Sequence, residues 1–271
     1  PTVTVLLGTG LFHQYVQLVA SEGFSGGDFY LPLDDSVKPG RSWQQTGGVR
    51  WDPVPEWRFS AEVWGSVLRN LVLLDNDTAG DEGDTSSETV FRSGGRGHAV
   101  GLELLAERRF GTVRGWVGYT LARTRRTFED VNGGYAFPPK YDRRHDLKAV
   151  ALWDRGPWKY SAAFVVASGQ AYTGAAARWG LHDPATGDYR ELVLPGTRNG
   201  ARLSPYHRLD VSVSRAFRLF GHDADWVAQV FNLYGRRNEW FVNFDTDDGD
   251  LDVRIVRMLP AIPSFGLNVR F

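Results

Sequence analysis

The sequence predicts an all-β protein: an antiparallel β-barrel that crosses a membrane with about ten strands. Three observations predict it. Short segments alternate between apolar and polar residues, short and long connections follow each other in turn, and the 271 residues include 10 Trp, 10 Tyr and 16 Phe. Trp and Tyr concentrate where a protein meets a membrane–water interface, and alternating segments of this kind form the walls of membrane barrels.

Composition limits the other classes. The chain has no Cys and a net charge of −1, which argues against a disulfide scaffold, thiolate metal sites and a nucleic-acid partner. Its apolar runs are short, and the run at residues 162–167 is among the longest, whereas a transmembrane helix needs ~20 residues. The chain therefore is soluble or crosses a membrane as strands. It opens in a strand-like segment with no signal peptide, so we expect a fragment or a processed chain.

The last segment, residues 263–271, shows the alternation most clearly. Phe265, Leu267, Val269 and Phe271 alternate with small or polar residues, and a period of two predicts a half-buried strand. This segment alone fits a wall between lipid and water and a soluble sandwich equally well.

Ten segments carry a strand pattern, although the phase of the ninth is ambiguous. For example, Trp57, Phe59 and Ala61 alternate with polar residues in the third segment. The ten segments lie near residues 2–8, 43–51, 57–67, 100–109, 113–121, 144–153, 158–166, 208–219, 225–234 and 263–271.

The connections decide between the two hypotheses. Tight turns fall near residues 52–55, 110–111, 154–157 and 220–223, and long polar stretches fall at residues 10–40, 71–95, 127–141, 172–204 and 235–260. A soluble sandwich has no reason to place every long loop at one end, whereas outer-membrane barrels combine short periplasmic turns with long extracellular loops. The pattern favours the barrel, with little helix outside a short one at residues 13–20.

Aromatic residues flank the tight turns. Trp51 and Trp57 flank one turn, and Trp153 and Trp158 flank another. We predict that these four form a membrane girdle that faces lipid at the periplasmic end. The alternative is that they pack on each other in a soluble core.

Several motifs resemble a known family. YDRRHDLKAVALW at residues 141–153, SGQAYT at 168–173 and VFNLYGRRN at 230–238 resemble late strands of TonB-dependent outer-membrane receptors. LFHQYVQL, SVKPGRSWQQTGGVRW and GHAVGLELLAERRF precede them in the order of that family. The resemblance implies a barrel of about 22 strands that is filled by an N-terminal plug. Ten strands without a plug then make residues 1–271 the C-terminal segment of such a barrel.

The resemblance also implies function and partners. It implies a ligand-uptake receptor in the Gram-negative outer membrane, with no enzymatic activity and no bound cofactor or metal. Its partners would be outer-membrane lipid, the missing N-terminal strands and plug, a TonB-type energy-coupling complex that acts through the plug, and the outer-membrane assembly machinery. That machinery would recognise the terminal strand, an assembly signal formed by Phe265, Leu267, Val269 and Phe271. Two open strand edges, at residues 2–8 and 265–271, would pair with the missing strands.

Few residues indicate chemistry. His145 and Asp146 are adjacent, so on a strand they point to opposite faces and cannot act as a catalytic pair. Acidic loops at residues 75–84 and 245–252 lack the spacing of an EF-hand, and we expect solvated surface there, with a weak divalent-cation site as the alternative. Aromatic residues of the long loops are candidate ligand contacts, although they could equally pack the loops together: Phe12, Tyr15, Trp179, Tyr189, Trp240 and Phe241.

Two other functions fit the sequence less well. One is a complete ten-stranded outer-membrane porin or adhesin. The other is an outer-membrane protease of the omptin type, which would need acidic residues and a His that converge at the outer mouth.

Overall fold

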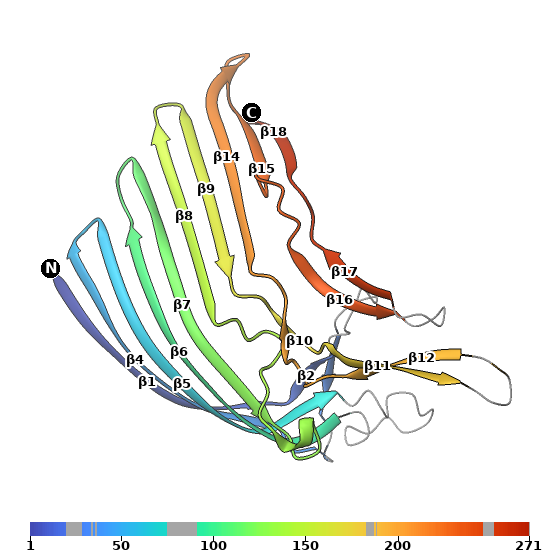
Figure 1. Ribbon diagram of the computed structural model, residues 1–271. Coiled ribbons are helices and arrows are strands. Elements are labelled where there is room, and N and C mark those ends of the chain that lie inside the picture. The colour runs from blue at the N-terminus through green and yellow to red at the C-terminus, as the bar shows by residue number, and fades with distance from the viewer. Residues whose placement is uncertain are drawn as a thin grey trace.

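Ten long strands hydrogen-bond side by side into one curved antiparallel sheet (Figure 1). Alternating apolar and polar residues form these strands because each face of the sheet then carries one kind of side chain. In spatial order the strands are β1 (Thr2–Gln14), β4 (Gly40–Val54), β5 (Trp57–Leu74), β6 (Phe91–Arg108), β7 (Val113–Thr127), β8 (His145–Arg155), β9 (Trp158–Ala167), β14 (Tyr206–Leu219), β15 (His222–Phe231) and β18 (Ile262–Arg270). The all-β antiparallel prediction, with ten strands, is confirmed.

The architecture comes from a computed structural model of the chain. It describes all residues except 20–28, 34, 36, 75–90, 183–186, 188, 246–251 and 271. In the part of the chain that it describes, no helix is long and apolar enough to span a lipid bilayer.

Short and long connections alternate along the sheet as predicted. Residues 55–56, 109–112, 156–157 and 220–221 make the short turns, and all four lie at one end of the sheet, which we call the turn end (Figure 1). The long connections lie at the opposite end, the loop end. Because consecutive strands of the sheet are antiparallel neighbours, every second connection returns to the same end.

Four two-stranded ribbons lie within the long connections (Figure 1). They pair β2 (Val16–Val19) with β3 (Phe29–Pro32), β10 (Ala171–Tyr172) with β13 (Ala201–Arg202), β11 (Ala175–His182) with β12 (Tyr189–Pro195), and β16 (Glu239–Asp245) with β17 (Asp252–Arg257). One 3-10 turn, η1 (Asn132–Gly134), is the helical element among the described residues.

The helix that the sequence predicted at residues 13–20 is wrong. His13 pairs with Arg41 at the end of β1, and Val16–Val19 pair with β3. Helical propensity in this short segment loses to pairing with neighbouring strands, which gives the backbone groups partners along their whole length.

Strands β5 and β6 run further into the loop end than the sequence predicted. They reach Leu74 and begin at Phe91, with register shifts around Leu71. The extension has a packing reason, because Leu71 and Leu73 lie against a buried cluster of Phe128, Val131 and Phe137. The rings of Phe128 and Phe137 stack on each other, with centroids 6.2 Å apart. The β7–β8 connection thus covers the end of β5 and forms a small core there.

The sheet is not closed, because β1 and β18 are its two edge strands. They contain residues 2–8 and 265–270, where the sequence predicts open edges. The register also settles the phase of the ninth segment. Trp226, Ala228 and Val230 lie on one face of β15. Their partners across the strand pair, in the same order, are Leu267, Phe265 and Pro263 of β18.

We predict that Gly115 of β7 tolerates no side chain. Its φ is +154°, and a Cβ there would overlap the carbonyl oxygen of Val150 in β8. In the full-length protein, Gly115→Ala should destabilise the sheet by about 1–3 kcal/mol and lower the fraction of heat-modifiable, folded protein on electrophoresis. The control is Gly266→Ala in edge strand β18, where a Cβ meets no atom within 4 Å. Equal folded fractions for the two variants would contradict the prediction.

Candidate functional site: the two faces of the sheet and the loop-end clamps

The side chains in the middle of one face of the sheet are almost all apolar, and we call this the outer face. The register aligns Val5 with Val49 and Val49 with Ala61, and the same alignment continues strand by strand. Its central positions include Val5, Leu7, Val49, Ala61, Val63, Leu102, Leu104, Val117, Ala149, Phe164, Val211, Ala228 and Phe265.

The opposite face, the inner face, carries the acidic residues of the strands. It includes Arg50, Arg58, Glu62, Glu103, Glu107, Arg114, Asp146, Lys148, Asp154, Lys159, Arg208, Asp210 and Asp225. Over the described strands of the sheet, no outer-face position holds Asp or Glu. Charge is therefore sorted by face, and not merely by sequence position.

The outer face is the convex one. Val63 is 58% exposed, whereas its chain neighbours Glu62 and Trp64 on the inner face are half-buried. A curved sheet spreads the side chains of its convex face and crowds those of its concave face. The polar groups thus line the hollow of the curved sheet.

Ion pairs hold many of the inner-face charges. Asp52 accepts hydrogen bonds from Nε and Nη2 of Arg58 at 2.9 and 3.0 Å. Arg114 of β7 lies 2.8 Å from Asp154 of β8. Two further pairs join residues that are two positions apart on the same strand, Lys148 with Asp146 and Arg208 with Asp210. Each pair is partly exposed, so each contributes at most about 1 kcal/mol to stability. Their main effect is to present a hydrated, charged wall.

Two carboxylates stand directly opposite each other near the centre of this wall. Glu62 of β5 pairs in register with Glu103 of β6, and the indole Nε1 of Trp64 donates to Glu103 at 3.0 Å. Like charges across a strand pair are destabilising.

Within the described residues, no three His, Asp or Glu side chains are close enough to hold a metal ion.

Aromatic clusters occupy the outer face at the turn end. Trp51 and Trp57 both pack on Phe59, with centroid distances of 5.6 and 5.7 Å. Trp153 and Trp158 likewise pack on Tyr160, at 5.0 and 6.1 Å. The four Trp of the expected girdle therefore lie on one face at one end.

Arginines lie over these indoles. Arg108 is 5.9 Å from the ring centre of Trp57, Arg155 is 5.8 Å from that of Trp153, and Arg215 is 5.2 Å from that of Trp158. Such cation–π contacts join an apolar body to a charged head group, an arrangement suited to an interface.

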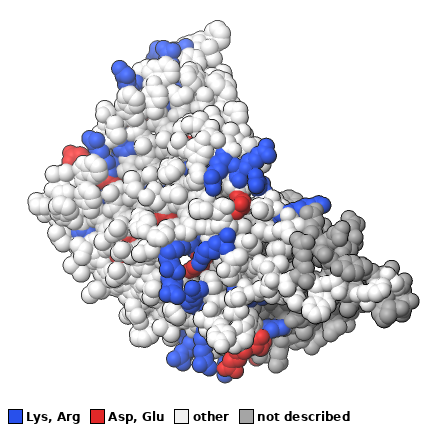
Figure 2. Space-filling model, in the orientation of Figure 1, with Lys and Arg blue, Asp and Glu red and all other residues white. Residues whose placement is uncertain are grey.

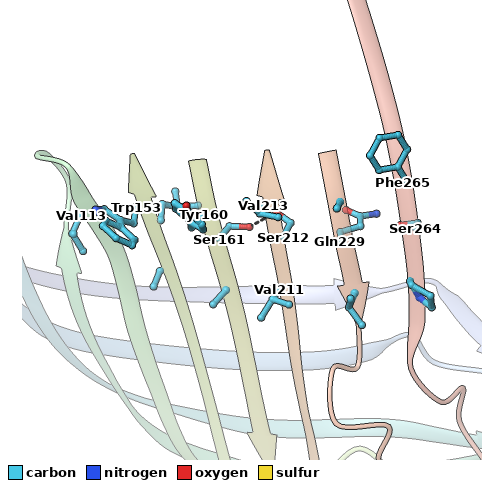
Figure 3. A pocket seen from close by; sticks show the side chains of 16 residues that line it. Val113, Trp153, Tyr160, Ser161, Val211, Ser212, Val213, Gln229, Ser264 and Phe265 are labelled. Carbon is cyan, nitrogen blue, oxygen red and sulfur yellow. Dashed lines mark hydrogen bonds between the residues drawn. The ribbon is translucent and has the colours of Figure 1, made fainter. Parts of the chain in front are cut away.

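A shallow apolar groove of about 850 Å³ crosses the sheet from β7 to β18. Small side chains of Ala151, Ala162 and Ala228 form its floor. Figure 3 shows Trp153 and Tyr160 at one end of the groove and Phe265 at the other. The groove exists because alanines stand between bulky rings on the outer face.

A clamp at the loop end depends on the buried Asp142. Its Oδ1 accepts a hydrogen bond from the backbone N–H of Thr124 at 2.7 Å, and its Oδ2 pairs with Nη2 of Arg202. Nη1 of Arg202 also donates to the carbonyl oxygens of Asp142 and Gly169. This clamp ties the β10–β13 ribbon to the ends of β7 and β8.

A second clamp depends on two asparagines. Nδ2 of the buried Asn232 donates to the carbonyl oxygens of Arg236 and Leu259, at 2.8 and 3.0 Å. Asn238 bonds both backbone groups of His207: its Nδ2 donates at 2.9 Å and its Oδ1 accepts at 3.1 Å. These bonds hold the start and the end of the β15–β18 connection against the sheet.

The candidate ligand-contacting aromatics lie on several elements. Phe12 is on the inner face of β1, and Tyr15 stacks on His13 with centroids 6.3 Å apart. Trp240 and Phe241 contact each other on β16 with centroids 5.4 Å apart, while Trp179 is on β11. Tyr189 lies on β12, and its side chain is outside the described residues, as are most of both acidic loops.

His145 and Asp146 point to opposite faces, as predicted. Nδ1 of His145 is 2.7 Å from the hydroxyl of Tyr119 on the outer face, and Asp146 pairs with Lys148 on the inner face. The dense charged segment at residues 142–146 thus contains a structural clamp and two separate side chains rather than a catalytic pair.

Sequence reasoning missed the two clamps. The pairing of Asp142 with Arg202 spans 60 residues and has no local signal. For the asparagine clamp the sequence did contain a signal, the Asn of the VFNLYGRRN motif. Asn is enriched among residues with positive φ, and Asn232 has a φ of +55° in the structure.

Comparisons with known proteins agree with this geometry. Residues 1–235 match the family described as "TonB dependent receptor-like, beta-barrel". A search of curated protein sequences gave no match.

Solved structures share the fold. The copper transporter OprC is 13% identical with a TM-score of 0.60, and the match covers 99% of this chain and 37% of OprC. A complex of FpvAI with pyocin S2 is 10% identical with a TM-score of 0.58, and the match covers 98% of this chain and 30% of that one. BauA, the ferric preacinetobactin receptor from Acinetobacter baumannii, is 13% identical with a TM-score of 0.53, and the match covers 97% of this chain and 34% of BauA. The chain thus spans about a third of the length of the structures that it matches.

We predict that loss of the Asp142 carboxylate loosens the loop end. Asp142→Ala leaves Nη2 of Arg202 and the Thr124 N–H without their carboxylate partner, and the loss of a buried hydrogen-bond acceptor costs about 1–3 kcal/mol locally. Limited proteolysis of the full-length protein should then cut the β9–β14 connection faster. The matched control is Asp223→Ala, whose pair with Arg218 is almost fully exposed and 3.6 Å long. Unchanged cleavage in Asp142→Ala would contradict the role of the clamp.

Proposed function

This chain belongs to the TonB-dependent receptor β-barrel family, and from that membership we propose that it forms part of the wall of an energy-coupled uptake receptor in the Gram-negative outer membrane. Members of the family are receptors and transporters of the outer membrane and not enzymes, which removes the omptin-type protease hypothesis.

The sorting of side chains by face is the observation that carries the proposal. A sheet with apolar residues on its convex face and charges on its concave face meets lipid on one side and water on the other. In hydrocarbon every backbone group needs a partner within the protein, and continuous pairing from β1 to β18 supplies one for the interior strands.

The two edge strands support the proposal that the wall is incomplete. β1 and β18 stand at opposite ends of the strand order, whereas a closed ten-stranded porin or adhesin would pair them. We infer that further barrel strands and a plug complete the receptor, since the match covers only 37% and 30% of two related structures. A TonB-type energy-coupling complex would act through that plug.

The two ends of the sheet have different roles in this proposal. The turn end faces the periplasm, and the loop end faces outside, where the clamped connections and the aromatics Phe12, Trp179 and Trp240 could meet an arriving ligand. The outward-facing Phe265, Leu267 and Val269 of β18, followed by Phe271, would serve as the signal for the assembly machinery. Phe271 lies outside the described residues.

Energy-dependent uptake tests the function. We expect cells that carry the full-length gene to accumulate one compound from a labelled panel of ferric siderophores, cobalamin, oligosaccharides and peptides. Accumulation should vanish when the gene or the TonB-type complex is deleted. Uptake that persists without the complex would favour a passive porin.

The Trp girdle gives a second test. Single-Trp variants that retain Trp51, Trp57, Trp153 or Trp158 should be quenched by brominated lipid at a shallow, interfacial depth, because all four lie on the outer face at the turn end. The inner-face Trp64 serves as the control and should escape quenching. Girdle indoles as unquenched as Trp64 would refute the orientation.

A further inference from the structure

A polar pocket of about 360 Å³ opens on the inner face at the turn end, between the last four strands of the sheet. Lys159 of β9 pairs in register with Ser214 of β14, and Asp223 of β15 pairs with Arg270 of β18. All four side chains line the pocket, together with Asp225 of β15. We call this cavity the turn-end pocket.

Two cations of the turn-end pocket are available to an incoming anion. Lys159 and Arg270 are exposed, and neither makes a salt bridge within the part of the chain that the structure describes. The in-register neighbour of Lys159 on β8 is Asp154, but that carboxylate lies 2.8 Å from Arg114. Lys159 therefore has a charge that its closest acidic neighbour does not compensate.

The acidic groups near Arg270 have other partners as well. Asp223, directly opposite Arg270, pairs with Arg218 at 3.6 Å. Asp225 accepts a hydrogen bond at Oδ2 from Nδ2 of Asn268 at 2.9 Å, which leaves its Oδ1 for another donor. The pocket thus presents two cations and one carboxylate oxygen to whatever enters it.

The space-filling view agrees with a local excess of positive charge. Figure 2 shows basic side chains, and no acidic side chain, at the tip of the molecule where Figure 1 places the β14–β15 turn. Elsewhere on the visible face, basic groups are separated by broad uncharged areas.

The direction of β18 determines which segment of a complete barrel would lie beside this pocket. β18 runs from Ile262, opposite Phe231 at the loop end, to Arg270 at the turn end, and one of its edges has no partner. In an antiparallel barrel the strand that pairs with this free edge runs the opposite way, so it begins at the turn end. The chain that leads into that strand passes the end of β18, next to Arg270.

We propose that the turn-end pocket holds the segment of polypeptide that leads from the plug into the first strand of the complete barrel. This inference rests on the proposed function, since it requires a plug and a first strand that pairs with β18. An acidic side chain of the segment would pair with Lys159 or Arg270, and a backbone N–H would donate to Oδ1 of Asp225. A peptide supplies both kinds of group, whereas a free anion supplies only the first.

Such an anchor would fix the register in which the barrel closes. A slip of one residue between the first strand and β18 would turn every side chain of the incoming strand to the wrong face. A bound entry segment sets the point at which pairing with β18 begins. The pocket lies at the point where β18 ends and where that pairing would start.

Site-specific crosslinking tests the occupant. In the full-length protein, a photo-reactive benzoylphenylalanine in place of Ser214 should crosslink to the residues just before the first barrel strand, as identified by mass spectrometry of the digested product. The matched control carries the same residue in place of Ser60, another half-buried inner-face serine, which lies on β5. It should not label that segment. Heat-modifiability confirms that both variants are folded.

A charge variant tests the contacts. Lys159→Gln/Arg270→Gln should make a protease cut the entry segment about tenfold faster, because two partly exposed ion pairs with the segment are lost. Arg50→Gln/Lys148→Gln removes one Arg and one Lys from the inner face away from the pocket and should leave the cleavage rate unchanged.

Three results would overturn the proposal. The residue at position 214 could crosslink to the body of the plug or to no peptide, the control at position 60 could label the same segment, or the two charge variants could be cut equally fast. Loss of energy-dependent uptake with an unchanged crosslink would instead count against the proposed transport function alone. A missing crosslink in a protein that still transports would count against the pocket alone.

Discussion

Continuous strand register is the constraint on which the rest of this structure depends. Successive side chains of a strand point to opposite faces, so a slip of one residue would turn a whole strand inside out. In β5 such a slip would turn Val63 to the concave face and Glu62 to the convex face. The apolar face, the charged face and the girdle all exist because ten strands keep the same phase.

The same register concentrates electrostatic cost where it can be relieved. Acidic side chains of the strands face the concave side, where water and cations such as Arg58 and Lys148 compensate them. On the convex side of the described strands, cations occur only near the two ends of the apolar band, at positions such as Arg41 and Arg215. A charge in the middle of the band would have no partner in hydrocarbon.

The connections at the loop end depend on a different kind of bond. Side chains of Asp142, Asn232 and Asn238 bond backbone groups of distant segments, because irregular chain has no neighbouring strand to pair with. Each clamp acts where a connection leaves the sheet. The sheet therefore positions the starts of the loops, and hence the surface that a ligand would meet first.

The sequence by itself determined the strands, the alternation of short and long connections and, outside the ninth segment, the face of each central residue, because a period of two is a local property that neighbouring residues reveal. It also showed that Trp51 and Trp153 stand beside tight turns. It could not reveal that residues 13–19 form strands, that β5 extends to Leu74, or that Asp142 meets Arg202. Those features depend on pairing and packing between segments far apart in the chain, and only the tertiary structure decides which distant partners meet.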